Sequence, residues 1–219
     1  SDDDVHYLEL EQAHQGGYVL QRQVMVLRED RCCYFADAVV RGQFDSVGRP
    51  RIAGESQHAP DGPSQLPEIE YQVRLPLAEL IAAEICPETT EVFLGRRKLD
   101  SQKGHPLKHH AMVLPLSSNE WRLAGSATKF SSTDDGHLLL SCRGVGQLYA
   151  PLWIDTNRKR FRGNRTCRQL SVEHQLQIVS DQDAVAYRIH IGSNQWIVYR
   201  SMAPPTPRTF FWPQRIADF

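Results

Sequence analysis

Apolar and polar residues alternate along most of this chain. The clearest stretch is Ile69–Leu77, in which every second residue is apolar and the residues between are charged, polar or proline. Because successive side chains of a strand point to opposite faces, this period of two places the apolar side chains on one face of a β-strand. Similar patterns predict further strands at Val5–Leu10, Tyr18–Leu27, Arg31–Val40, Ala111–Leu116, His137–Cys142, Gln147–Ile154, Ala184–Ile191 and Gln195–Ser201.

Two connections between these segments have the composition of hairpin turns. Residues 28–30 join the second and third segments along the chain, and residues 192–194 join the last two. Both connections are short and consist of polar residues or glycine, which is typical of turns between antiparallel strands. Nine alternating segments in one chain therefore predict an all-β fold, an antiparallel β-sandwich with at most one or two short helices.

Helix signals are confined to two segments. Leu77–Ile85 contains good helix formers with apolar residues at helical spacing, and Pro87 follows it, so we expect a short helix there. Ser171–Val179 fits either a helix that Ser171 caps or a strand with one apolar face. Both alternatives stay open for this second segment.

The segments fit a single domain over residues 1–219, because all-β domains often exceed about 200 residues. Residues 42–67 are rich in glycine, proline, serine and glutamine, which predicts a long loop. Prolines at 204, 205 and 207 predict an extended C-terminal arm over residues 203–219 that leads to the aromatic residues 210–212.

Composition and charge indicate a folded, soluble chain. Apolar residues make up 41% of the sequence, and 25 Lys+Arg against 26 Asp+Glu give a formal net charge of −1. No apolar run reaches the roughly 18–20 residues of a membrane span, so no membrane partner is expected. The first four residues resemble neither an initiator methionine nor a signal peptide, which suggests a piece of something longer.

The cysteines give a weaker indication. Five are present, an odd number that cannot all pair within one chain, and no Cys-x-x-Cys motif occurs. We expect small buried thiols without chemical activity, which favours a reducing compartment such as the cytoplasm.

The strongest charge feature lies near the start of the C-terminal third, at residues 158–168. Six cations occur within eleven residues, and no acid lies between Asp155 and Glu173. Such a concentration attracts anions, and the planar arginine fork binds a carboxylate, sulfate or phosphate through two hydrogen bonds. The alternative is a solvated loop whose cations pair with distant acids. The cations are Arg158, Lys159, Arg160, Arg162, Arg165 and Arg168.

Histidines and aromatic residues supply two further candidate sites. His105, His109 and His110 fall within six residues, but adjacent residues of a strand face opposite ways and Pro106 interrupts a helix, so converging metal ligands are not expected. Trp212 could stack on a sugar ring. Trp196 and Tyr199 are expected to pack in the core.

One hairpin also suggests a family. The strand Tyr18–Leu27 contains Arg22, and the strand that follows its turn ends in an aromatic, apolar run around Asp37. This pattern resembles a hairpin in the C-terminal β-sandwich of heparinase II/III-type polysaccharide lyases, and residues 195–201 resemble segments of large bacterial proteins. The resemblance implies a supersandwich that packs against a helical toroid. This chain lacks a long helical region, so no catalytic residues are carried over.

We therefore expect a non-catalytic binding or structural domain of a larger protein that acts on acidic polysaccharide. Its expected partners are an acidic glycan and a neighbouring domain, with no cofactor, and a nucleic acid is not expected. Two other functions remain open. One is a metal-dependent enzyme that uses His105, His109 or His110 with a carboxylate, and the other is an interaction module whose arm, Pro204–Pro207, docks on a neighbour.

Overall fold

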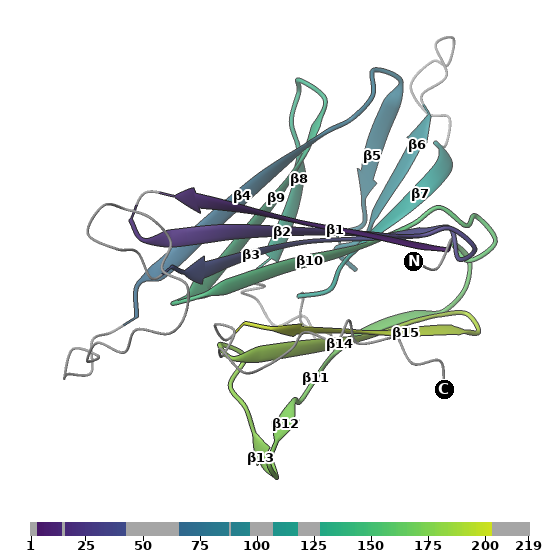
Figure 1. The fold of residues 1–219 in the computed structure, drawn as a ribbon. Coiled ribbons are helices and arrows are strands. Elements are labelled where there is room, and N and C mark those ends of the chain that lie inside the picture. The colour runs from purple at the N-terminus through teal and green to yellow at the C-terminus, as the bar shows by residue number, and fades with distance from the viewer. Residues whose placement is uncertain are drawn as a thin grey trace.

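A computed structural model describes residues 4–14, 16–42, 66–87, 89–96, 107–117 and 128–202 (Figure 1). The regular structure of these residues consists entirely of β-strands, so the predicted all-β class is confirmed. No helix in this part of the chain is long and apolar enough to cross a membrane. The predicted arm, Trp212 and most of the predicted loop over residues 42–67 lie outside the described residues.

The largest sheet has seven strands in the order β1-β2-β3-β10-β7-β6-β5, and each neighbouring pair is antiparallel. The turn at residues 28–31 joins β2 to β3 with Leu27 opposite Cys32, which confirms the first predicted hairpin. The strands are β1 (Val5–His14), β2 (Tyr18–Leu27), β3 (Cys32–Arg41), β5 (Ile81–Ile85), β6 (Val92–Arg96), β7 (Lys108–Pro115) and β10 (Leu148–Asp155).

Smaller sheets lie on the two faces of this large sheet. One contains β4 (Glu68–Pro76), β9 (His137–Val145) and β8 (Thr128–Ser132), in that order. The other contains β11 (Arg165–Leu170), β14 (Ala184–Ile191) and β15 (Asn194–Ser201). Gly192, with φ of +63°, allows the tight turn between β14 and β15 and confirms the second predicted hairpin.

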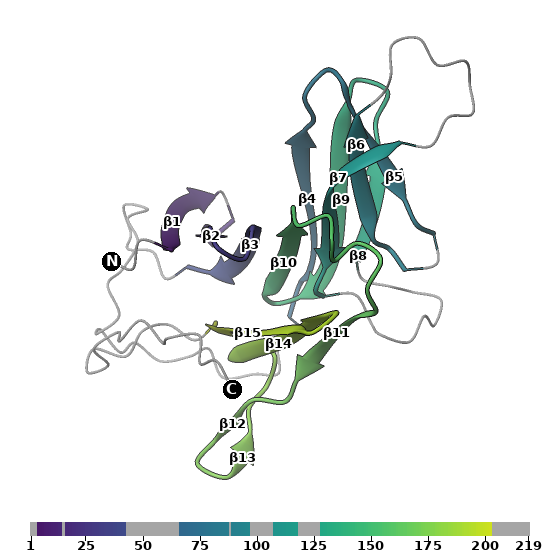
Figure 2. The same ribbon diagram turned by 90° about the vertical axis from the view of Figure 1, so that its right-hand side faces the viewer.

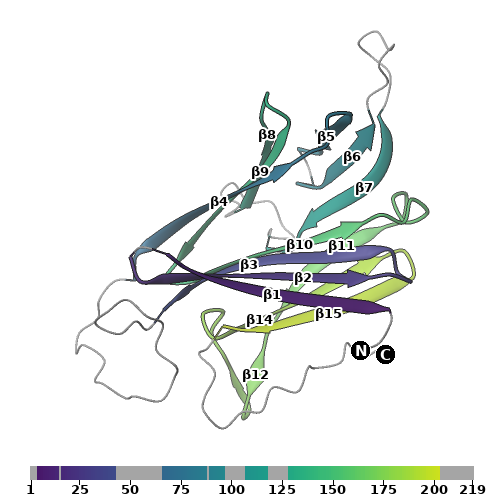
Figure 3. The ribbon, with the colours of Figure 1, turned by 45° about the horizontal axis from the view of Figure 1, so that its top comes forward.

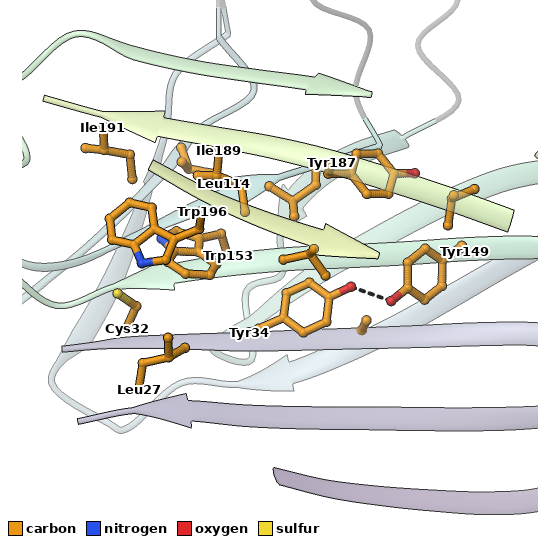
Figure 4. Close-up of a cluster of buried hydrophobic side chains, with 14 of the residues drawn as sticks. Leu27, Cys32, Tyr34, Leu114, Tyr149, Trp153, Tyr187, Ile189, Ile191 and Trp196 are labelled. Carbon is orange, nitrogen blue, oxygen red and sulfur yellow. Dashed lines mark hydrogen bonds between the residues drawn. The ribbon is translucent and has the colours of Figure 1, made fainter. Parts of the chain in front are cut away.

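Two hydrophobic cores hold these layers together. The first lies between the large sheet and β14–β15, which run beneath β3 and β10 (Figure 2). Within it the rings of Trp153 and Trp196 are 4.8 Å apart (Figure 4). The second lies between the large sheet and β4–β9. Successive side chains of β3 point to opposite faces, so this strand contributes side chains to both cores: Tyr34 packs in the first and Phe35 against the second.

The helix expected over Leu77–Ile85 is wrong. A turn closed by a 2.7 Å hydrogen bond from the Ile81 amide to the Ala78 carbonyl leads into β5, which pairs with β6. Pairing with β6 satisfies the backbone and places Ala82 in a buried position, so tertiary contact overrides helix propensity. The open segment Ser171–Val179 forms a small hairpin of two short strands, β12 (Glu173–His174) and β13 (Gln177–Ile178).

Candidate functional site

The cation run is divided between the interior and the surface. Arg160 is buried, and its Nε lies 2.7 Å from Oδ2 of Asp155, which is fully buried. Its guanidinium also lies over the Trp196 ring, 5.1 Å from the centroid. Burial opposes the charge on Arg160, but the carboxylate of Asp155 outweighs it and raises the pKa of Arg160. This arginine is therefore part of an internal ion pair.

Arg165 is also directed inward. Its Nε and Nη2 donate hydrogen bonds of 2.9 and 2.8 Å to the two carboxylate oxygens of Glu91. Its guanidinium lies 5.6 Å from the centroid of the Phe93 ring. A bidentate contact of this kind holds the guanidinium in one orientation, so Arg165 also serves the fold.

Three other cations of the run lie on an exposed turn. Arg158, Lys159 and Arg162 lie between β10 and β11, and within the described residues none of them forms an ion pair. The turn contacts the end of the β14–β15 hairpin, where the Gly192 amide donates a 3.0 Å hydrogen bond to the Asn164 carbonyl. The exposed charges therefore border the β11–β14–β15 sheet.

The sixth cation, Arg168, lies on the face of β11–β14–β15 that points away from the first core, here termed the outer face. Arg168 is directly opposite Arg188 of β14, and Arg188 is opposite Ile197 of β15. The next pair of residues on the same face is Ala186 and Tyr199, and the side chain of Tyr199 is 46% exposed. The core position expected for Tyr199 is therefore wrong, because register places it opposite Ala186 on the outer face, whereas Trp196 packs inside as expected.

The outer face has an uneven charge distribution. The three strands contain four arginines and no acidic residue. The two inward arginines are neutralised, Arg165 by Glu91 and Arg200 by Glu9 at 2.7 Å. Sequence reasoning did not single out Arg188, although the alternation of Ala184–Ile191 already places it opposite the apolar face of its strand.

The two residues of the lyase-like hairpin lie together on neighbouring strands. Arg22 and Asp37 are opposite each other on β2 and β3, and two hydrogen bonds of 2.8 and 2.9 Å join the guanidinium to the carboxylate. Tyr71 of β4 donates a 2.5 Å hydrogen bond to the same carboxylate. Burial and the Asp37 carboxylate raise the pKa of Tyr71, so this hydroxyl keeps its proton at neutral pH and is a poor general base.

A chain of polar groups crosses the edge of the first core. The hydroxyls of Tyr34 and Tyr149 are hydrogen-bonded (Figure 4), and Tyr149 donates a 2.8 Å hydrogen bond to the side-chain oxygen of Gln23. The Gln23 amide then donates to the Tyr7 hydroxyl at 2.7 Å, and Tyr7 donates to Glu9 at 2.8 Å. This chain links a buried position of β3 to the exposed strand β1.

The histidines do not converge within the described residues. His109 stacks on Phe93 at 4.7 Å, and its Nε2 lies 2.9 Å from the Glu84 carboxylate. His110 is an unpaired extra residue of β7 and lines a shallow hollow with Arg96. His105 lies outside the described residues. No three histidines, cysteines or carboxylates of the described part are close enough to hold a metal ion.

The buried cysteines Cys32 and Cys142 offer no reactive thiolate at neutral pH. All five cysteines are free. Burial raises the pKa of Cys32 to about 12 and that of Cys142 to about 11. Since the thiolate is the nucleophile, these two thiols are inert.

Comparisons with known proteins found no matching family model, no matching curated protein and no matching solved structure. The lyase resemblance of the β2–β3 hairpin stays a prediction. The function must therefore be argued from the geometry of the chain itself.

Proposed function

We propose that this protein is a non-catalytic binding domain whose outer face of β11–β14–β15 binds an acidic polysaccharide. The observation that supports this most strongly is the pair Arg168 and Arg188, directly opposite each other on strands that contain no acidic residue. Two guanidinium groups in directly opposed positions on one face of a sheet are close enough for both to donate hydrogen bonds to the same carboxylate or sulfate.

The neighbouring side chains suit a sugar. Tyr199 and Ile197 are 46% and 38% exposed on the same face, and β-sheet geometry keeps them in one surface with the arginines. An aromatic side chain packs against the apolar face of a sugar ring, while an arginine fork binds a carboxylate or sulfate with two hydrogen bonds. One face can therefore recognise both the ring and the charge of an acidic sugar.

The charge distribution favours a glycan over a nucleic acid. The whole chain has a formal net charge of −1, and the outer face contains two arginines, bordered by three cations on the turn. Nucleic-acid duplexes present one charge per about 1.7 Å and usually need a broad basic surface. A polymer with one anionic group per sugar or disaccharide requires fewer cations at wider spacing. As the lyase resemblance implies, such a domain would serve a larger protein that acts on this polymer.

Affinity electrophoresis tests the proposal. The protein is run through gels that contain polygalacturonate, alginate, chondroitin sulfate or heparin, alongside Arg188→Gln and Tyr199→Ala. The matched control is Arg143→Gln, because Arg143 is an exposed arginine of another sheet, on β9. At least one polymer should retard the protein and the control variant, and retardation should fall in both outer-face variants. Retardation by none of the polymers, or equal retardation of all variants, would overturn the proposal. Stronger retention by single-stranded DNA would point to nucleic acid instead.

A further inference from the structure

Strand β1 forms a long exposed edge of the seven-stranded sheet (Figure 3). It pairs with β2 without a register shift from Val5 opposite Leu27 to His14 opposite Tyr18. Within the described part of the chain, no strand pairs with its other side. All its residues after Val5 are exposed, including Leu8 at 52% and Leu10 at 53%.

An edge of this kind is a template for another strand. Its unpaired N–H and C=O groups can pair with an added chain, and natural proteins usually block such edges with proline, charged side chains (lysine above all), a bulge or a very short strand. The only acidic or basic charges on β1 besides its histidines are Glu9 and Glu11, which a basic partner would neutralise. β1 has ten residues, no proline, no lysine and no register shift. Together with the exposed leucines, this makes β1 suited to strand addition by a partner.

The two faces of β1 define the chemistry of that partner. His6, Leu8 and Leu10 lie on one face, and the two acids Glu9 and Glu11 lie on the other. Glu9 is ion-paired with Arg200, whereas Glu11 accepts a hydrogen bond from the neutral amide of Gln21. The described part of this edge thus presents two exposed leucines on one face and two acids on the other.

Charge also decides against a second copy of the chain. In an antiparallel pair of identical edges, opposite residues lie on the same face of the sheet, so Glu9 and Glu11 can only meet residues of the same parity. When two copies of Val5–His14 pair in this way, the two registers with the most paired residues place Glu9 of one copy opposite either Glu9 or Glu11 of the other. Like charges in directly opposed positions destabilise a sheet.

We infer that β1 is a docking edge for an extended segment of another protein that alternates apolar and basic residues. Its apolar side chains lie beside Leu8 and Leu10, and a basic side chain lies beside Glu11. Backbone hydrogen bonds supply much of the affinity, and the alternating side chains supply the selectivity.

A designed peptide tests this edge. The probe is a fluorescein-labelled ten-residue peptide of alternating valine and lysine, matched to the length of β1. Its controls are the fully N-methylated peptide, which cannot pair, and a peptide of alternating valine and glutamate. Binding to the full chain is measured by fluorescence anisotropy, and hydrogen exchange reports protection of the β1 amides. Glu11→Lys is compared with Glu173→Lys, which reverses an exposed charge on β12.

The valine–lysine peptide should bind and protect the β1 amides, and Glu11→Lys should weaken binding by at least about fivefold, because an attractive cross-strand pair becomes repulsive. Glu173→Lys should bind like the unchanged protein. If circular dichroism shows Glu11→Lys unfolded, Glu11→Gln replaces it, with an expected loss of about twofold. Equal binding of either control peptide, or no binding at all, overturns the inference. A dimer with protected β1 amides and no peptide would assign the edge to a second copy.

Discussion

The substitution Arg160→Met tests how the fold divides the cation run. Arg160 and Arg162 are two residues apart and cannot be distinguished by composition, yet Arg160 is buried and Arg162 is exposed. Removing the Arg160 guanidinium leaves the carboxylate of Asp155 fully buried, with a 2.7 Å hydrogen bond from the Asn157 amide.

The expected cost follows from that burial. Breaking a buried ion pair by removing one partner destabilises a protein by about 3–5 kcal/mol, because a charge is left without compensation. Arg160→Met should lower the free energy of unfolding by about that amount, and Arg162→Met should change it by less than about 0.5 kcal/mol. The double variant Asp155→Asn with Arg160→Met should recover part of the loss, because the buried charge is gone.

Urea unfolding followed by far-ultraviolet circular dichroism measures these differences. The two methionine variants should be prepared in parallel, since both replace one arginine with the same apolar residue. If the free energies of unfolding of Arg160→Met and Arg162→Met differed by less than about 1 kcal/mol, Arg160 would not have the structural role described above. It would also fail if the double variant were less stable than Arg160→Met alone.

Three further predictions concern the polar chain and the thiols. Tyr149→Phe removes the donor to Gln23 and should lower the free energy of unfolding by about 1–3 kcal/mol in urea; an unchanged value would contradict the buried network. Partial burial of the Tyr7 hydroxyl and its hydrogen bond to Glu9 raise the pKa of Tyr7 from 10.0 to about 12, so its contribution to stability is complete below pH 10 and is lost as pH rises through about 12; circular dichroism should show stability falling over this interval, and a constant value would disagree. Cys32 and Cys142 should react with a thiol reagent at neutral pH only as fast as the protein unfolds; mass spectrometry that found rapid labelling would contradict their burial.

The sequence predicted the fold best where one face of a strand is buried and the other is solvated. The predicted strands Tyr18–Leu27 and Ala184–Ile191 match β2 and β14 at both ends. β6 was missed because Val-Phe-Leu-Gly-Arg does not alternate, and β11 was missed because its polar residues were assigned to the cation run. These strands form because their backbone N–H and C=O groups are hydrogen-bonded to a neighbouring strand. The pattern of apolar and polar residues within the strand does not show this pairing.

The candidate site was predicted in part, for a similar reason. The pattern showed a surplus of positive charge around Arg158–Arg168, and three of these cations are exposed on the turn. The partners of the inward cations are Glu91, 74 residues from Arg165, and Asp155. The neighbour of Arg168 on the outer face is Arg188, which the register of β11 and β14 places there. Register and tertiary packing decide both outcomes, so residue spacing alone could not reveal them.

The most direct test of the binding face is a heteronuclear nuclear magnetic resonance titration of the labelled protein with the acidic oligosaccharide that corresponds to the retarding polymer. The proposal predicts that the largest shifts occur at Arg168, Arg188 and Tyr199, on the outer face of β11–β14–β15, and that added salt reduces them. Shifts concentrated around Arg143 on β9, or no shifts at any concentration of the oligosaccharide, would contradict it.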